Sequence, residues 1–123
     1  MLITNIMAVS LDGRIASHPD EADADRLRLG FTSKDDFDHL LEQLRCTDAV
    51  IVGSSSLKAS GQAFALQNDR GKYPVWAVLS QRGLPPEQPF YQQAELPRWI
   101  VSPQPLNFPP HQGAVSYTHL RAH

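Results

Sequence analysis

The chain has 123 residues, 41% of them hydrophobic and 20% charged, which is the composition of one modest soluble domain. Its formal net charge of −2 removes the usual electrostatic case for binding nucleic acid or an anionic membrane. The single cysteine, Cys46, excludes a disulfide within the chain, and no apolar run is long enough to cross a membrane. A cytoplasmic location is the default expectation.

The first third of the chain predicts a strand, a turn and a loop. Residues 2–9 (LITNIMAV) are apolar and include β-branched side chains, which predicts a buried strand. The turn that follows, residues 10–14, contains Gly13, which is free to adopt a positive φ. Residues 18–25 are polar and acidic and predict a surface loop.

A helix is predicted to begin at Ser33. Asp36 lies three residues further on, which resembles a capping box with aspartate in place of glutamate. One apolar helix face follows at the spacing i, i+3, i+4 and i+7, formed by Phe37, Leu40, Leu41 and Leu44.

Three further strands are predicted. Residues 48–52 end in the run AVIV, which is typical of a strand buried on both faces, and residues 57–60 form a short helix closed by Gly61. Residues 74–80 and 98–102 are the other two strands, and the tryptophan in each is expected in the core. Apolar strands separated by helices or loops predict an α/β fold with a mostly parallel sheet flanked by helices.

The last nine residues, VSYTHLRAH, have a different character. They back-translate to the end sequence of a transposase-based sequencing adapter, so we predict that residues 1–114 are a partial domain and that residues 115–123 are a non-native tail. The alternative is a genuine C-terminal strand with a basic end. On the first interpretation the tail supplies no ligand or catalyst, and an incomplete sheet implies weak stability and no activity.

Residues 49–61 (AVIVGSSSLKASG) form a candidate phosphate site. A buried strand runs into Gly53 and then into Ser54, Ser55 and Ser56 at a helix start, where free backbone N–H groups and hydroxyls attract anions. The alternative is an ordinary serine N-cap without a ligand. The segment matches neither a P-loop nor a dinucleotide fingerprint.

The other candidate functional residues carry weaker signals in the sequence. Asp12 follows the first predicted strand, where a carboxylate would meet a substrate, although Asp-Gly is also a common turn. Neither His18 nor His39 has a partner at metal-ligand spacing, so no metal is expected. Cys46 lacks a nearby base in the sequence and is expected to be an inert helix-end residue.

Taken together, two motifs resemble the reductase domain of riboflavin biosynthesis, which is similar in fold to dihydrofolate reductase. NIMAVSLDGR (residues 5–14) is similar to the family text AMSLDGKIA, and DAVIVG (residues 48–53) is similar to the start of DAILVGAGTVRADDP. The resemblance runs from residue 2 to about residue 102 and implies the N-terminal part of a dihydrofolate-reductase-like domain.

The resemblance implies an NADPH-dependent reductase that converts the ribose of a phosphoribosylamino-pyrimidine into a ribityl chain. It assigns cofactor binding to Ala8, Gly53, Ser54, Ser55, Ser56, Ser60 and Ser80, substrate binding to Ser10 and Asp12, and a catalytic role to Asp12. The protein's share of such chemistry is mainly to orient the cofactor and the substrate. Family members often form homodimers, which would apply to the full-length protein.

The chain also departs from the family pattern. Ser60 stands where the family often has aspartate, Gly30 and Phe31 lie near a common tryptophan, and Leu44 falls where an arginine contacts substrate. These departures keep two alternatives open: a reductase of the same fold with another small-molecule substrate, and a non-catalytic nucleotide-binding module.

Overall fold

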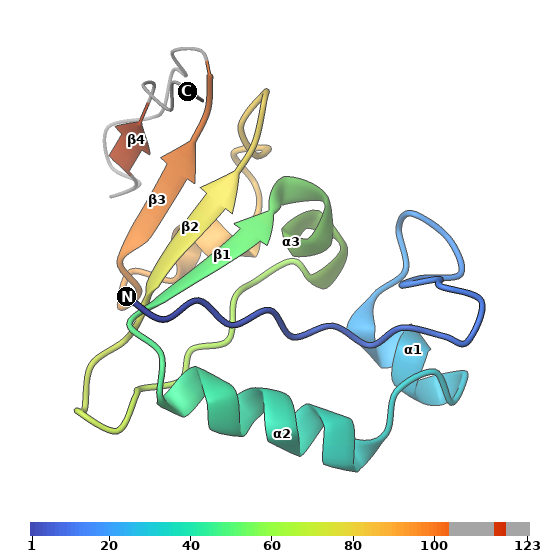
Figure 1. Cartoon of the computed structure of the whole chain (residues 1–123). Helices are drawn as coiled ribbons and strands as arrows, with labels where there is room; N and C mark the ends of the chain where they lie inside the picture. Colours follow the sequence, from blue (N-terminus) through green and yellow to red (C-terminus); the bar gives the residue numbers. More distant parts are fainter. Residues whose placement is uncertain (104–114, 118–123) are drawn as a thin grey trace.

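The computed structural model describes residues 1–103 and 115–117. Its centre is a sheet of four parallel strands in sequence order, namely β1 (Ala49–Gly53), β2 (Val75–Leu79), β3 (Arg98–Val101) and β4 (Val115–Tyr117) (Figure 1). The predicted α/β class with a mostly parallel sheet is therefore confirmed, and the arrangement is consistent with part of a dihydrofolate-reductase-like sheet.

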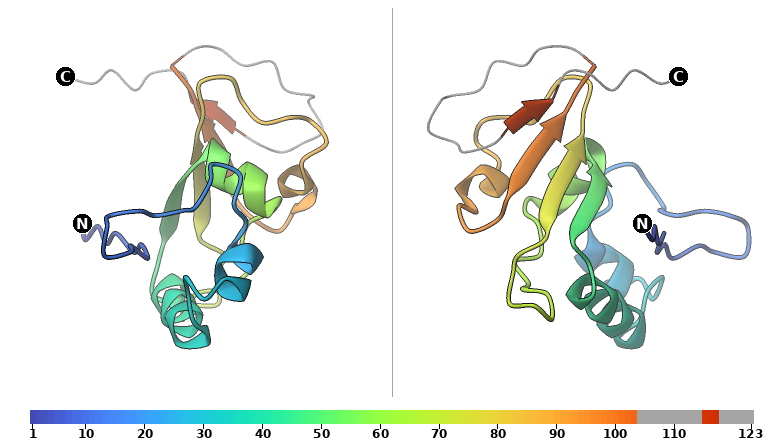
Figure 2. Two further views of the ribbon diagram at one scale, coloured as in Figure 1. Left: turned by 90° about the vertical axis from the view of Figure 1, so that its right-hand side faces the viewer. Right: turned by 60° about the vertical axis from the view of Figure 1, so that its left-hand side comes forward.

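Four helical segments accompany the sheet: α1 (Asp23–Arg28), α2 (Lys34–Arg45), α3 (Ser54–Ser60) and the 3-10 helix η1 (Pro89–Gln92). In Figure 1, α2 runs below the sheet near the amino ends of the strands, while α3 lies beside β1. The two views of Figure 2 place α2 at this same lower end. The crossover from β1 to β2 therefore contains α3, and the crossover from β2 to β3 contains η1.

The predicted capping box of α2 is confirmed. The Ser33 hydroxyl accepts from the Asp36 backbone N–H at 3.1 Å, and the Asp36 carboxylate accepts from the Ser33 backbone N–H at 2.8 Å. The Ser33 backbone N–H and the Ser33 hydroxyl, which both donate to the carboxylate, hold the pKa of Asp36 below its usual value because they favour the charged form. Two orphan donors of the first helical turn are satisfied in this way.

One face of the sheet is packed and forms the core. Val78 and Ile100 are fully buried there, and Phe90 of η1 and Leu57 of α3 cover them. The register Val52–Val78–Ile100 places these residues of neighbouring strands on the same face. We call this the covered face.

Large side chains on the opposite face are exposed in the part of the chain that the structure describes, and we call it the open face. Ile51, Leu79 and Trp99 project from it with exposed fractions of 69%, 45% and 39%. The prediction that residues 48–52 are buried on both faces is wrong, because β1 is an edge strand with one uncovered side. Trp76 lies in the core as predicted, but Trp99 does not, because neighbouring strands carry the two rings on opposite faces.

The predicted strand at residues 2–9 is absent from the structure. The segment has no regular structure, and most of its apolar side chains are exposed. The turn after it does form, with Gly13 at φ 80° and its N–H bonded to the Ser10 carbonyl at 2.9 Å. A β-strand needs a neighbouring strand to pair with, and the sequence of residues 2–9 does not determine whether such a partner is present.

The acidic stretch 18–25 is only partly the surface loop that was predicted. Its last residues open α1, and Glu21 is 4% exposed. Glu21 accepts hydrogen bonds from the hydroxyl and the backbone N–H of Ser17 and pairs with Arg26 at 3.5 Å. The Ser17 hydrogen bonds are the main reason why the pKa of Glu21 lies below its usual value.

The last strand falls in the predicted tail. β4 pairs in parallel with β3, with Trp99 opposite Val115 and Val101 opposite Tyr117. The alternative interpretation expected such a strand, and a three-residue ladder is compatible with either origin of the sequence. The boundary at residue 114 lies outside the described residues and stays a prediction, as does the expectation that His119, Arg121 and His123 of the tail supply no ligand or catalyst.

Candidate functional site

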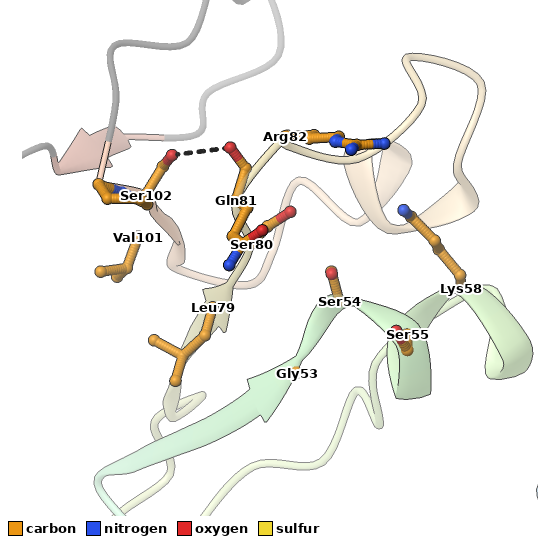
Figure 3. A pocket seen from close by; sticks show the side chains of 11 residues that line it. Gly53, Ser54, Ser55, Lys58, Leu79, Ser80, Gln81, Arg82, Val101 and Ser102 are labelled. Carbon is orange, nitrogen blue, oxygen red and sulfur yellow. Dashed lines mark hydrogen bonds between the residues drawn. The ribbon is translucent and has the colours of Figure 1, made fainter. Parts of the chain in front are cut away.

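A cavity of about 620 Å³ opens at the carboxyl ends of β1, β2 and β3. The three strands end side by side, and the residues that follow each of them form the walls (Figure 3). Ligands of open α/β sheets gather at this edge, because the chain turns away there and leaves backbone groups and loop side chains facing a common space.

The lining of this cavity carries positive charge. Among the described residues that line it, Lys58 of α3 and Arg82 after β2 are the ionisable ones, and none is an aspartate or a glutamate. Figure 3 shows the Lys58 amino group and the Arg82 guanidinium on the same side of the cavity. Within residues 1–103 and 115–117, neither side chain forms an ion pair. The two cations form a local excess of positive charge in a chain that is net negative as a whole. This local excess favours an anionic ligand.

The hydroxyl groups of the cavity fall into two kinds. The Ser80 hydroxyl donates to the Gly83 carbonyl at 2.8 Å, and the Ser102 hydroxyl donates to the Gln81 carbonyl at 3.4 Å (Figure 3). Both residues are buried, and their bonds fix the loop after β2 against the end of β3. Ser54 and Ser55, at the start of α3, make no side-chain bond to the described part of the chain, so their hydroxyls are available to a ligand.

Gly53 leaves open room beside its backbone. A Cβ atom built there would meet no other atom within 4 Å, and its φ of −74° is accessible to any residue. The protein alone therefore does not require glycine at this position. A ligand that packs against the backbone of Gly53 would require it, which makes the position a selective probe of binding.

The structure brings together only some of the predicted site residues. Gly53, Ser54, Ser55 and Ser80 line the cavity. Ser56 and Ser60 lie on α3 but outside the lining, and the Ser60 hydroxyl instead donates to Asp23 at 3.4 Å.

The predicted substrate residues lie elsewhere. Ala8, Ser10 and Asp12 belong to the N-terminal part of the chain and are not among the cavity residues. The Asp12 carboxylate accepts from the Ser10 hydroxyl and pairs with Arg14 at 3.1 Å, in an exposed turn. Its partners are therefore all within two residues in the sequence.

Four polar residues of the lining escaped the sequence-based prediction: Lys58, Gln81, Arg82 and Ser102. A signal for three of them was present, because Gln81 and Arg82 directly follow the predicted strand 74–80 and Ser102 is the last residue of the predicted strand 98–102. Applying the strand-end rule to every strand, and not only to the first two, would have found them.

Cys46 lies at the C-terminal end of α2, as predicted, and is a free, exposed cysteine. Its Sγ donates to Asp69 at 3.5 Å, and this bond, together with the charge of Asp69, raises the pKa of the thiol. A raised pKa keeps the sulfur protonated and a poor nucleophile, which agrees with the prediction of an inert residue.

The described residues contain neither a metal-binding cluster nor a membrane-spanning helix. No group of three or more histidine, cysteine, aspartate and glutamate side chains lies close enough to hold a metal ion. No helix within residues 1–103 and 115–117 is long and apolar enough to cross a membrane.

Comparison of the chain with protein-family models, with curated proteins and with solved structures gave no match.

Proposed function

We propose that this chain is part of an NADPH-dependent reductase that acts on the ribose of a phosphoribosylamino-pyrimidine, as in riboflavin biosynthesis. The observation that supports the proposal is the cavity at the strand ends, whose described lining pairs two cations with free serine hydroxyls and contains no carboxylate. NADPH carries more negative charge than NADH because of its extra phosphate, so a cationic wall favours it.

The roles of the lining residues follow from their chemistry. Lys58 and Arg82 would neutralise cofactor phosphate, and the hydroxyls of Ser54 and Ser55 would donate to its oxygens. The bare backbone at Gly53 gives a phosphate room to approach. NADPH supplies the hydride when bound, and the chain's contribution is to hold and orient it.

The test is a titration of the 123-residue chain with NADPH and with NADH, followed by cofactor fluorescence and by the thermal midpoint. We expect NADPH to bind more tightly, and a concentration of about 100 times Kd to stabilise the fold by about 2.7 kcal/mol. The double variant Lys58→Ala, Arg82→Ala is expected to weaken NADPH binding at least tenfold and to reduce the preference over NADH, each tenfold being about 1.4 kcal/mol.

Two variants make this titration selective. Lys72→Ala removes an exposed cation that does not line the cavity, and NADPH binding should be unchanged. Gly53→Ala leaves the fold intact, since its Cβ meets no atom of the protein, but should obstruct a phosphate at the backbone. Equal affinity for NADPH in all three variants and the unaltered chain would rule out the cavity as the cofactor site.

A second candidate is a nucleotide-binding module without catalysis. It is favoured by the position of Asp12, whose carboxylate is engaged within its own turn and is not part of the cavity lining. Oxidation of NADPH in the presence of the pyrimidine ribosylamine phosphate would exclude this candidate and support the reductase. A screen of other carbonyl substrates then separates it from a reductase of different specificity.

We also propose a cytoplasmic location. The one cysteine is exposed and unpaired, which suits a reducing compartment, and the proposed cofactor is a soluble metabolite of that compartment.

A further inference from the structure

Arg82 lies in a short loop that is anchored at both ends. The loop follows β2, and Gln81 and Arg82 are its exposed residues. Ser80 before them and Gly83 and Leu84 after them are buried, and Leu84 packs in the hydrophobic core. Within the described part of the chain, the Arg82 side chain makes no hydrogen bond or ion pair. The backbone of this loop therefore sets the direction of the guanidinium.

Ser80 fastens the loop to itself and to β3. Its hydroxyl donates to the Gly83 carbonyl at 2.8 Å, and its N–H donates to the Val101 carbonyl at 3.0 Å. Gly83 has a φ of 77°, a conformation that glycine adopts without strain and that closes the loop. The resemblance assigns Ser80 to cofactor binding, and in the structure its hydroxyl is already bonded within the loop that carries Arg82.

Ser102 fastens the same loop to the end of β3. Its hydroxyl donates to the Gln81 carbonyl at 3.4 Å (Figure 3), and the residue is only 1% exposed. The Gln81 carbonyl and the Arg82 N–H belong to one planar peptide group, so a bond that holds the carbonyl also orients the N–H. The Ser102 hydroxyl therefore acts on the peptide from which Arg82 begins.

We propose that Ser102 is a positioning residue, which orients the Gln81–Arg82 peptide and so holds the Arg82 guanidinium on the Lys58 side of the cavity. Ser80 supports the same loop from the end of β2. An arginine that starts from a fixed peptide reaches fewer positions, so an anion that binds to it immobilises less of the chain. That this anion is a phosphate of NADPH rests on the proposed function, whereas the positioning of Arg82 does not.

The backbone order of the loop in the ligand-free 123-residue chain is the first test. NMR relaxation should give amide order parameters of about 0.85 at Gln81 and Arg82 in the unaltered chain and below about 0.6 in Ser102→Ala. The matched control is Ser102→Thr, which keeps a hydroxyl and should keep the loop ordered. Unchanged order at Val78 in β2 shows that the sheet persists in both variants.

A double-mutant cycle of anion binding is the second test. Inorganic pyrophosphate is titrated by calorimetry, at constant ionic strength, into the unaltered chain, Ser102→Ala, Arg82→Ala and the double variant. If Ser102 acts through Arg82, Ser102→Ala weakens pyrophosphate binding about threefold to tenfold when Arg82 is present and leaves it unchanged in the Arg82→Ala background. A serine that only stabilised the fold would weaken binding equally in both backgrounds.

Loss of loop order in Ser102→Ala, together with weakening that depends on Arg82, supports the positioning role. An ordered loop in Ser102→Ala overturns it, and so does equal weakening in both backgrounds or no binding of pyrophosphate. The same chains titrated with NADPH separate this inference from the proposed function. Coupling of Ser102 to Arg82 for pyrophosphate without any binding of NADPH keeps the positioning role and rejects the proposed cofactor. NADPH binding without coupling does the reverse.

Discussion

Residues 49–103 and residues 1–48 are held together in different ways. Of the eleven buried hydrophobic residues in the described part of the chain, ten belong to the first region, and Leu44 alone belongs to the second. The second region is held largely by hydrogen bonds between near neighbours, such as Ser33 with Asp36 and Ser17 with Glu21. Local bonds shape turns and helix ends, but only packing between distant residues stabilises a tertiary fold.

The largest expected effect lies in the packed region. Ile100→Ala removes a fully buried side chain from the covered face, and we expect a loss of about 2–5 kcal/mol in the free energy of unfolding. Ile51→Ala is the matched control, because the same side chain is 69% exposed on the open face, and we expect less than about 0.5 kcal/mol. Urea unfolding of both variants measures the difference. Equal losses would show that the open face is covered in solution.

The next effect concerns a pair of hydrogen bonds between a side chain and the backbone inside the packed region. The Gln93 side chain donates to the Ala63 carbonyl at 2.8 Å and accepts from the Ala63 N–H at 2.9 Å. Because Ala63 is buried, Gln93→Ala leaves two backbone groups unsatisfied, and we expect a loss of about 1–3 kcal/mol. The exposed neighbour Gln92 is the control, and Gln92→Ala should be nearly silent in the same unfolding experiment. If Gln93→Ala left the free energy of unfolding unchanged, water would have to replace the two hydrogen bonds of the Gln93 side chain.

A smaller effect is expected in the N-terminal region. Ser33→Ala removes the capping box of α2 and should cost about 1 kcal/mol. Ser56→Ala, an exposed serine inside α3, is the control and should cost nothing measurable. If the two regions unfold separately, hydrogen exchange of α2 will accelerate while that of β2 stays constant. Equal acceleration in both would show that the regions form one cooperative unit.

The smallest effect is a pH dependence centred on Glu21. Its pKa is lower in the folded chain than the ordinary value of 4.5, mainly because of the Ser17 hydrogen bonds. The stabilisation is therefore complete above pH 4.5 and is lost as the pH falls through the folded pKa. Glu21→Gln should flatten the acid side of the thermal-midpoint profile, whereas Glu87→Gln, at an exposed site, should leave it unchanged. An unaltered profile in Glu21→Gln would contradict this assignment.

The sequence predicted well what is encoded locally. The capping box at Ser33, the short helix ending at Gly61 and the three strands β1, β2 and β3 were all located within a few residues. Each depends on spacing, on a cap or on a run of apolar residues, and such signals require no knowledge of distant partners.

What the sequence missed depends on partners far along the chain. An apolar run such as residues 2–9 looks the same whether or not an edge is paired with it, so its strand was predicted and is absent from the structure. Trp99 is as apolar as Trp76, and only the register decides which of them faces the core. The cavity cations Lys58 and Arg82 come from separate crossovers, and their convergence requires the sheet order.

The positions of the two indole rings provide a way to observe each side of the sheet separately. Trp76 is 5% exposed and Trp99 is 39% exposed, and they lie in adjacent strands with opposite orientations. Intrinsic fluorescence should therefore contain a blue-shifted component shielded from iodide and a red-shifted component that iodide quenches. A molecule that binds to the open face will alter the second component first. The fluorescence of Trp99 therefore reports association at this face of the sheet.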